Sequence, residues 1–271
     1  MNGFQKVIKV FAICLAVFII GNICMLIFSG IALITGFDAS SNSEKLKEFN
    51  KTYQNIEIID IDIASSNIEI KSGNEFKIEA DTKNELTCKE VNGKLKVEED
   101  NNWFINSNLS GNIVIYIPEG IILRELDLDT GAGEIKVENI KAEKFDLDQG
   151  AGLLKIINSK FDKIDIDGGA GKIEVDSSEL NNLDLDCGAG KVEIESKITG
   201  NSKISAGVGE INLSLIGNKE DYQITAEKGI GSIRIENQEC SSNTVYGTGD
   251  NKIKIEGGIG SIIIEYKNQS I

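Results

Sequence analysis

Residues 126–137 read LDLDTGAGEIKV, and the pattern returns as FDLDQGAGLLKI (145–156), IDIDGGAGKIEV (164–175) and LDLDCGAGKVEI (183–194). Successive copies begin 19 residues apart, and apolar residues occupy the same places in each copy. A fixed period near twenty residues is typical of a solenoid, in which each unit buries its apolar side only by stacking on its neighbours. The sequence therefore predicts an all-β fold, a parallel β-solenoid or β-helix-like repeat domain with about 19 residues per unit.

The Gly-Ala-Gly of each copy predicts a corner between two strands. Glycine permits positive φ and close backbone approach, and the residue between the glycines is small enough to stack on its counterparts. A fifth copy, with valine in place of alanine, follows at the same spacing. The predicted corner glycines are Gly131, Gly133, Gly150, Gly152, Gly169, Gly171, Gly188, Gly190, Gly207 and Gly209.

Charge and composition limit the function of the chain. It carries 28 basic and 43 acidic residues, a net charge of −15, which disfavours nucleic acid and anionic lipid as partners. Histidine is absent, which removes the commonest general base and most zinc and copper sites. Cys88, Cys187 and Cys240 are an odd set with irregular spacing, so we expect packing residues, with one disulfide pair left open. The composition predicts that the chain is not an enzyme and has no catalytic cofactor.

The first 37 residues differ from the rest. No charged residue occurs from Val10 to Phe37, a run long enough for a helix across a bilayer core of about 30 Å. It is longer than the apolar stretch of about 7–15 residues in a cleaved signal peptide. Lys6 and Lys9 precede the run and Asp38 follows it, so the N-terminus is expected in the cytoplasm. We predict a single-pass transmembrane signal anchor in the cell membrane, with the C-terminal domain extracytoplasmic.

The chain divides into five predicted regions. A short cytoplasmic tail and the anchor occupy residues 1–37, and a polar juxtamembrane linker with a helical turn capped by Ser43 occupies 38–55. Period-two alternation predicts a β-hairpin and capping region over 56–125, with Asn92-Gly93 as a two-residue turn. Regular repeats cover 126–217. Degenerate repeats and a C-terminal cap cover 218–271, and SIIIEY (261–266) is predicted to be an exposed end strand.

Two aspartates precede the corner in each of the first four copies. The apolar residues beside them face the core, so both aspartates face outward and stack in columns. This arrangement is either a solvated acidic face or a weak calcium ladder, because calcium prefers several carboxylate oxygens. The G-G-x-G-x-D pattern of calcium-binding β-rolls is not matched, since Lys172 and Ile173 follow the glycines. The candidate ligands are Asp127, Asp129, Asp146, Asp148, Asp165, Asp167, Asp184 and Asp186.

A membrane anchor, strand hairpins, the strand VIYIPEG (114–120) and serial Gly-Ala-Gly units follow one another in this chain. This order resembles the bacterial "putative adhesin" domain family of unknown function, also called the toastrack family. The resemblance covers roughly residues 55–271. It implies an envelope-exposed β-repeat domain, often tethered by one helix, with some members similar to partners of envelope-stress systems. The family has no catalytic motif to carry over.

Three functions are consistent with these features. The first is a non-catalytic, adhesin-like, membrane-tethered module that binds a cell-envelope protein or wall polymer and serves as an accessory of envelope-stress sensing. The second is a polysaccharide-active β-helix enzyme, which needs a buried acid pair in a groove. The third is a scaffold that self-associates through SIIIEY. The lack of catalytic residues favours the first. Trp103 and Phe104, in an Asn-rich loop, are expected to cap the first apolar layer or to form an exposed contact.

Overall fold

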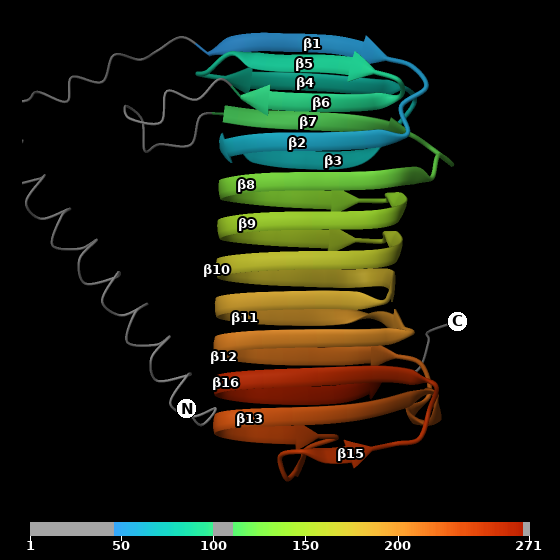
Figure 1. The fold of residues 1–271 in the computed structure, drawn as a ribbon, viewed down its shortest axis with the longest axis vertical. Coiled ribbons are helices and arrows are strands. Elements are labelled where there is room, and N and C mark those ends of the chain that lie inside the picture. Colours follow the sequence, from blue (N-terminus) through green and yellow to red (C-terminus); the bar gives the residue numbers. More distant parts are fainter. Residues whose placement is uncertain (1–45, 100–110, 268–271) are drawn as a thin grey trace, which may run out of the picture. The chain divides into compact units, whose positions relative to one another are not determined.

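The computed structural model describes residues 46–99 and 111–267, which fall within the unit Lys45–Ile271. This part of the chain contains sixteen β-strands and one 3-10 helix (Figure 1). In chain order the elements are β1 (Lys47–Tyr53), β2 (Ile58–Ser65), β3 (Asn67–Gly73), β4 (Phe76–Thr82), β5 (Leu86–Val91), β6 (Lys94–Glu99), β7 (Gly111–Pro118), β8 (Leu123–Glu138), β9 (Lys141–Ile157), β10 (Lys160–Asn181), β11 (Leu183–Thr199), β12 (Asn201–Ile216), η1 (Lys219–Asp221), β13 (Tyr222–Ile235), β14 (Gln238–Glu239), β15 (Thr244–Tyr246) and β16 (Asn251–Lys267).

The predicted membrane anchor, Ser43, Trp103 and Phe104 lie outside the described residues. Over residues 46–99 and 111–267, no helix has the length and apolar character needed to cross a membrane. The predictions made for the anchor and for the loop around Trp103 therefore stay predictions.

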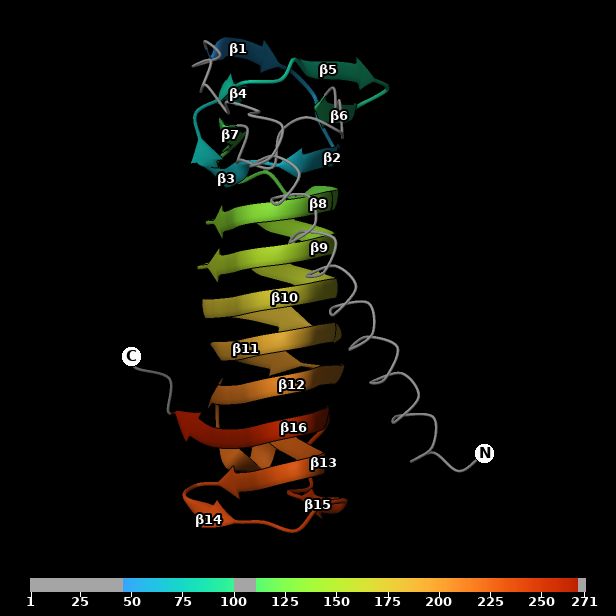
Figure 2. The ribbon, with the colours of Figure 1, turned by 90° about the vertical axis from the view of Figure 1, so that its left-hand side faces the viewer.

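The regular repeats stack as parallel rungs, as the 19-residue period predicts. β8, β9, β10, β11 and β12 are neighbours in that order, and each pairs in parallel with the next. Leu126 lies opposite Phe145, and Phe145 lies opposite Ile164, so the register equals one repeat. Figures 1 and 2 show these strands as successive coils, each bent back at its corner. The prediction of an all-β, solenoid-like fold is confirmed.

Each rung buries apolar side chains from both sides of its corner. In β8, Leu126 and Leu128 precede the corner and Ile135 and Val137 follow it, and all four side chains are buried. The equivalent positions are buried in the following rungs, so that apolar columns run through the stack. Burying one such side chain contributes about 1.5–3 kcal/mol, and this is gained only when a neighbouring rung covers it.

Both glycines of a corner are required by the neighbouring rung. A Cβ on Gly150 would lie 2.6 Å from the carbonyl oxygen of Gly131, and one on Gly152 would lie 1.9 Å from that of Gly133. Gly152 also has a φ of +146°, which residues with a side chain rarely adopt. The predicted Gly-Ala-Gly corner is confirmed.

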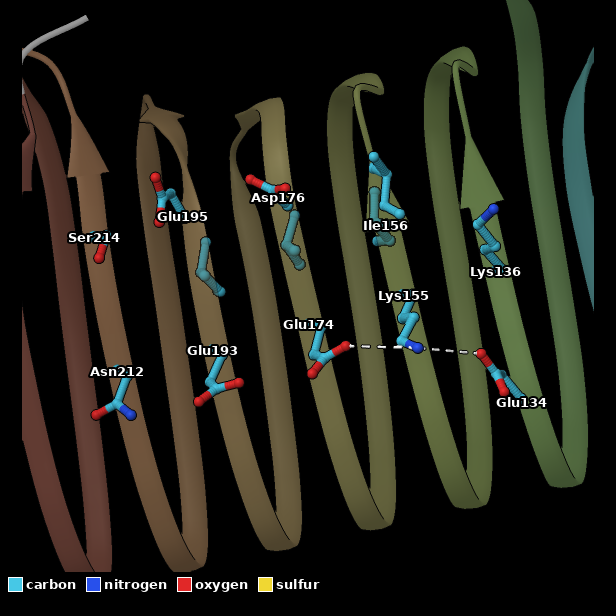
Figure 3. A pocket seen from close by; sticks show the side chains of 13 residues that line it. Glu134, Lys136, Lys155, Ile156, Glu174, Asp176, Glu193, Glu195, Asn212 and Ser214 are labelled. Atoms are coloured by element: carbon cyan, nitrogen blue, oxygen red, sulfur yellow. Dashed lines mark hydrogen bonds and ion pairs between the residues drawn. The ribbon is translucent and has the colours of Figure 1, made fainter. Parts of the chain in front are cut away.

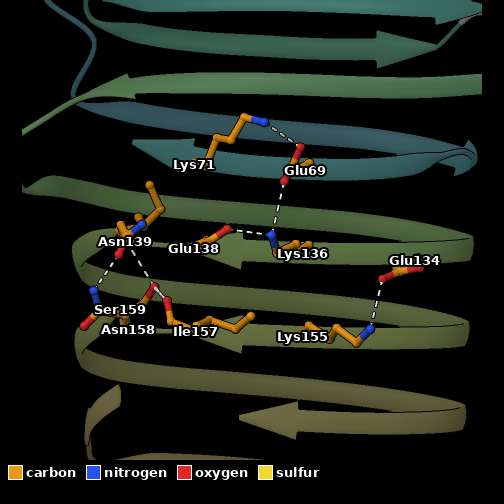
Figure 4. A network of polar contacts seen from close by, with 11 residues as sticks. Glu69, Lys71, Glu134, Lys136, Glu138, Asn139, Lys155, Ile157, Asn158 and Ser159 are labelled. Carbon is orange, nitrogen blue, oxygen red and sulfur yellow. Dashed lines mark hydrogen bonds and ion pairs between the residues drawn. The ribbon is translucent and has the colours of Figure 1, made fainter. Parts of the chain in front are cut away.

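A second corner, where the chain returns to the next rung, is formed by asparagines. Asn139 and Asn158 have left-handed backbone, with φ of 59° and 46°. Asparagine tolerates this conformation better than most residues. The side-chain amide of Asn158 donates to Oδ1 of Asn139 at 2.5 Å (Figure 4). The polar residues of the return therefore interact between rungs.

Buried serines at this second corner pair with backbone groups of the preceding rung. The hydroxyl oxygen of Ser159 accepts from the backbone N–H of Ile140 at 3.1 Å. Ser178 accepts from the N–H of Ser159 at 3.1 Å, and Ser196 accepts from that of Ser178 at 3.2 Å. Because an unpaired buried N–H is costly, this serine ladder stabilises the return corners.

The C-terminal strand lies inside the stack. β16 pairs in parallel with β12 on one side and with β13 on the other, so the rung order is β12, β16, β13 (Figures 1 and 2). Ile262 and Ile264 of SIIIEY are 2% and 0% exposed. The prediction that SIIIEY is an exposed end strand is therefore wrong, because the chain forms β13 first and then returns to the place beside β12. The short antiparallel strands β14 and β15 pair with β13.

The N-terminal end of the stack consists of separate strands. β2 and β3 pair in parallel with β8, and β6 and β7 extend the two layers beyond them. The β5–β6 hairpin turns at Asn92-Gly93, whose φ values of 53° and 77° fit the predicted two-residue turn. β1 pairs with β4. The linker predicted over 38–55 is therefore wrong for residues 47–53, because Phe49 and Tyr53 pack on the core.

Candidate functional site

The eight predicted aspartates form two columns on the surface of the strand halves that precede the corners, here called the aspartate face. Each aspartate lies opposite its equivalent one rung away, and all eight are exposed or half-buried. One column contains Asp127, Asp146, Asp165 and Asp184, and the other contains Asp129, Asp148, Asp167 and Asp186.

Lysines in the adjoining rungs neutralise the ends of these columns. Asp60 of β2 continues the first column, and its Oδ2 lies 2.5 Å from Nζ of Lys94. At the other end, Lys203 takes the aspartate position in β12. Its Nζ lies 3.7 Å from Oδ1 of Asp186 and 3.7 Å from Oε2 of Glu256. Ion pairs thus close the first column at its β2 end and both columns at β12, whereas Asp62, which continues the second column, has no lysine Nζ within 4.0 Å among the described residues.

Asp165 and Asp167 in the middle of the columns retain the repulsion between rungs, whereas Asp146 pairs with Lys144, whose Nζ lies 2.7 Å from its Oδ2. Partial burial and then the charges of the equivalent aspartates in both neighbouring rungs raise the pKa of Asp165, and the same causes raise the pKa of Asp167. Burial and then Asp146 and Asp60 raise the pKa of Asp127. Two unit charges one rung apart, about 4.8 Å, repel by a little under 1 kcal/mol in water and by more where partly buried.

The carboxylates of the two columns do not converge on a single point, as the ligands of a metal ion would. Within the described residues 46–99 and 111–267, no group of three or more histidine, cysteine, aspartate or glutamate side chains is placed to hold a metal ion. Each rung contributes its aspartates singly, at rung spacing. The calcium ladder and the solvated acidic face therefore both stay predictions for these eight residues.

The strand halves that follow the corners form a second surface, here called the mixed-charge face. A groove of about 700 Å³ crosses its rungs. Figure 3 shows Lys155 in this groove between two glutamates, with Nζ 3.4 Å from Oε1 of Glu134 and 4.0 Å from Oε2 of Glu174. One column of this face contains Lys136, Lys155, Glu174, Glu193 and Asn212.

Ion pairs link the mixed-charge face across rungs. Nζ of Lys136 lies 3.3 Å from Oε1 of Glu69 and 2.5 Å from Oε2 of Glu138 (Figure 4). Nζ of Lys71 lies 2.8 Å from Oε2 of Glu69, and this hydrogen bond is the first cause that lowers the pKa of Glu69. This face was not predicted from the sequence. Its signal was present, since Glu134 and Lys136 are replaced two repeats later by Lys172 and Glu174, with lysine and glutamate exchanged.

The three cysteines of the repeat domain are packing residues. Cys187 is 4% exposed and shares an inward column at the corner with Gln149 and Ala206. Cys88 and Cys240 are half-buried, and all three thiols are free. The disulfide pair that the sequence left open is not formed.

Stacked rungs, glycine corners and polar return ladders define the chain as a parallel β-repeat protein of the solenoid-like class. It belongs to the Toastrack DUF4097 family, which matches residues 56–256. The match spans β6, β7 and every regular rung, so the resemblance read from the sequence is confirmed. No curated protein matches the chain.

Several solved bacterial structures are similar. A "putative adhesin" from Bacteroides fragilis NCTC 9343 has a TM-score of 0.52 at 13% identity, with 82% of this chain and 97% of that chain covered. A "putative cell adhesion protein" from Clostridium sporogenes ATCC 15579 has a TM-score of 0.42 at 20% identity, with 82% and 100% covered. A "putative lipid binding protein" from Parabacteroides distasonis ATCC 8503 has a TM-score of 0.41 at 17% identity, with 81% and 96% covered. The similarity to the Bacteroides fragilis structure, at 13% identity, is a similarity of fold alone.

Proposed function

We propose that the chain is a non-catalytic, adhesin-like binding module of the cell envelope. In this proposal the apolar run over residues 10–37 anchors it in the cell membrane, and the β-repeat lies outside the cytoplasm. The module binds a cell-envelope protein or a wall polymer and serves as an accessory of envelope-stress sensing. Membership of the toastrack family and the long uncharged run support this proposal.

The uniformity of the aspartate face supports binding over catalysis. General acid–base chemistry needs two carboxylates whose environments differ, held in a cleft. On the aspartate face each carboxylate is exposed or half-buried and is flanked by its own equivalents. Among the described residues the one buried acidic side chain is Glu99, which accepts from the Asn84 amide at 3.2 Å. These surroundings favour an extended partner that contacts several rungs over a polysaccharide-cleaving site.

Crosslinking of the full-length protein in its native membrane, followed by mass spectrometry, tests the proposal. We expect one envelope protein or wall polymer to be captured through residues of the aspartate face or the mixed-charge face. Crosslinks between copies alone would favour the scaffold function. Release of soluble sugars from wall polysaccharide by the purified protein would favour the enzyme.

A further inference from the structure

We propose that a stripe on the aspartate face binds a linear anionic polymer whose charges are phosphate groups. The inference rests on the proposed function, because it names the chemical class of one envelope partner. The stripe, here called the lysine stripe, lies where the aspartate columns end. It consists of Lys163, Asn201, Lys252, Gln223 and Thr225.

The register aligns these side chains across neighbouring rungs. Asn201 of β12 lies opposite Lys252 of β16, and Lys252 lies opposite Gln223 of β13. Lys163 of β10 precedes Asn201 by two 19-residue repeats and therefore continues the same column. The stripe borders a groove of about 620 Å³ in which Asp184 is the one acidic lining residue.

The stripe contains unpaired cations on a face where other lysines are paired. Nζ of Lys144 lies 2.7 Å from a carboxylate oxygen, that of Lys203 lies 3.7 Å, and that of Lys254 lies 2.5 Å. In the part of the chain that the structure describes, no carboxylate oxygen lies within 4.0 Å of Nζ of Lys163 or Lys252. Both lysines are exposed. Neither charge is held in an ion pair, so both can contact an anionic ligand, although Lys163 also acts electrostatically on Asp165.

Polar groups without partners accompany these lysines. Within residues 46–99 and 111–267, the side chains of Asn201, Gln223 and Thr225 form no hydrogen bond. Amides and hydroxyls donate to phosphate oxygens and to the hydroxyls of a polyol or sugar chain. The stripe therefore offers two cations, with neutral donors between and beyond them.

The spacing of the two lysines favours a polymer over a single anion. From β10 through β11 and β12 to β16 there are three rung steps, about 14 Å at 4.8 Å per step. One phosphate does not bridge that distance, whereas phosphates repeated along a chain do. Lysine acts as a point charge for phosphate, while planar carboxylate is better matched by the arginine fork, which the stripe lacks.

The net charge of the chain does not exclude this ligand. At physiological ionic strength charges are screened over about 8 Å, so that of the aspartates only those beside the stripe, Asp165 and Asp184, act strongly on a bound polymer. Binding then depends on the contacts at the stripe, and it should weaken steeply with salt.

Binding of inorganic polyphosphate to the full-length protein tests the inference. The double variant Lys163→Gln/Lys252→Gln is expected to bind about tenfold more weakly, a loss typical of two exposed ion contacts. Its slope of log K against log salt should be shallower by about 1.4, the value for two lost contacts on a single-stranded polyanion. Lys141→Gln/Lys197→Gln is the matched control, because both residues are exposed lysines away from the stripe.

Three outcomes would overturn the inference. The first is no polyphosphate binding by the wild-type protein, and the second is an equal loss in the control. The third is equally tight, stripe-dependent binding of orthophosphate or of vesicles with anionic phospholipid, which would contradict a linear ligand. None of these outcomes decides the proposed function, because crosslinking in the native membrane tests that separately.

Discussion

A Cβ placed on Gly190 would lie 1.8 Å from the carbonyl oxygen of Gly171, its counterpart one rung earlier. Gly190 also has a φ of +147°, so both the available space and the backbone conformation require glycine. The corners therefore pack backbone against backbone. Any side chain at this position would push neighbouring rungs apart and weaken the apolar columns beside it.

Gly190→Ala should be strongly destabilising. Backbone strain and overpacking together are expected to cost roughly 2–6 kcal/mol. Urea unfolding of the full-length protein measures the loss. Ala189→Ser is the matched control, since Ala189 is exposed in the same corner. Equal stability of the two variants would contradict the close approach at the corner.

Asp165→Asn and Asp167→Asn should each stabilise the protein at neutral pH. Each removes a charge that faces like charges in both neighbouring rungs, an effect of about 0.2–1 kcal/mol. Thermal unfolding of the variants measures this gain. Asp60→Asn is the control, because Asp60 pairs with Lys94 at 2.5 Å and its loss should bring no gain. A gain at Asp60 as large as that at Asp165 would argue against column repulsion as the cause.

The gain from Asp165→Asn/Asp167→Asn should depend on pH. Both aspartates have folded-state pKa values raised above the ordinary 3.8, so their charged forms cost stability at neutral pH. As the pH falls through the raised values, the wild-type aspartates become protonated and that cost disappears. The difference in Tm between variant and wild type should therefore be largest at pH 7 and vanish below 3.8.

Carboxylates with lowered pKa act in the opposite direction. Hydrogen bonds from lysines lower the pKa of Glu69 and Glu193, and the stability that these pairs add is lost as the pH falls through the lowered values. The wild-type protein and the Asp165→Asn/Asp167→Asn variant both contain these pairs, so their effect cancels in the difference in Tm. A constant difference in Tm across this range would contradict the raised pKa values.

Deletion of residues 251–271 should open the stack beside β12. β16 pairs with both β12 and β13, so its loss leaves two unpaired edges. Hydrogen exchange should accelerate in β12 and β13, while β8 to β10 keep their protection because rungs interact chiefly with their neighbours. Deletion of residues 268–271 alone leaves β16 whole and serves as the control. Unchanged exchange in β12 after the longer deletion would contradict the rung order.

Calcium should leave the stability of the protein unchanged if the aspartate face is simply solvated. We expect the same Tm in chelator and in millimolar calcium. A calcium ladder would instead stabilise the fold, by about 1.4 kcal/mol at tenfold excess over Kd. An increase in Tm that Asp167→Asn removes and that magnesium does not reproduce would favour the ladder.

The spacing of the copies predicted much of the fold because each rung repeats the same contacts. Gly150 and Gly152 mark a corner in the sequence, since only glycine fits there, and the register follows from the period. β1 was not predicted because KEFNKTY lacks the alternation of a half-buried strand, and its two aromatic residues gain their burial from distant segments. The aspartate columns were predicted correctly, whereas their neutralisation by Lys203 was not.

The sequence by itself determined the rung, its corner and the residues that face inward, because these depend on local backbone geometry and on a period within one unit. Only the tertiary structure decided which rungs are neighbours when the period fails. β12 and β13 each offer an edge with which β16 pairs in parallel. The repeat spacing does not show that β13 forms one rung farther along and that the chain then returns to place β16 beside β12. The unpaired state of Lys163 and Lys252 was decided in the same way, because ion pairs form between rungs and depend on which rung lies alongside.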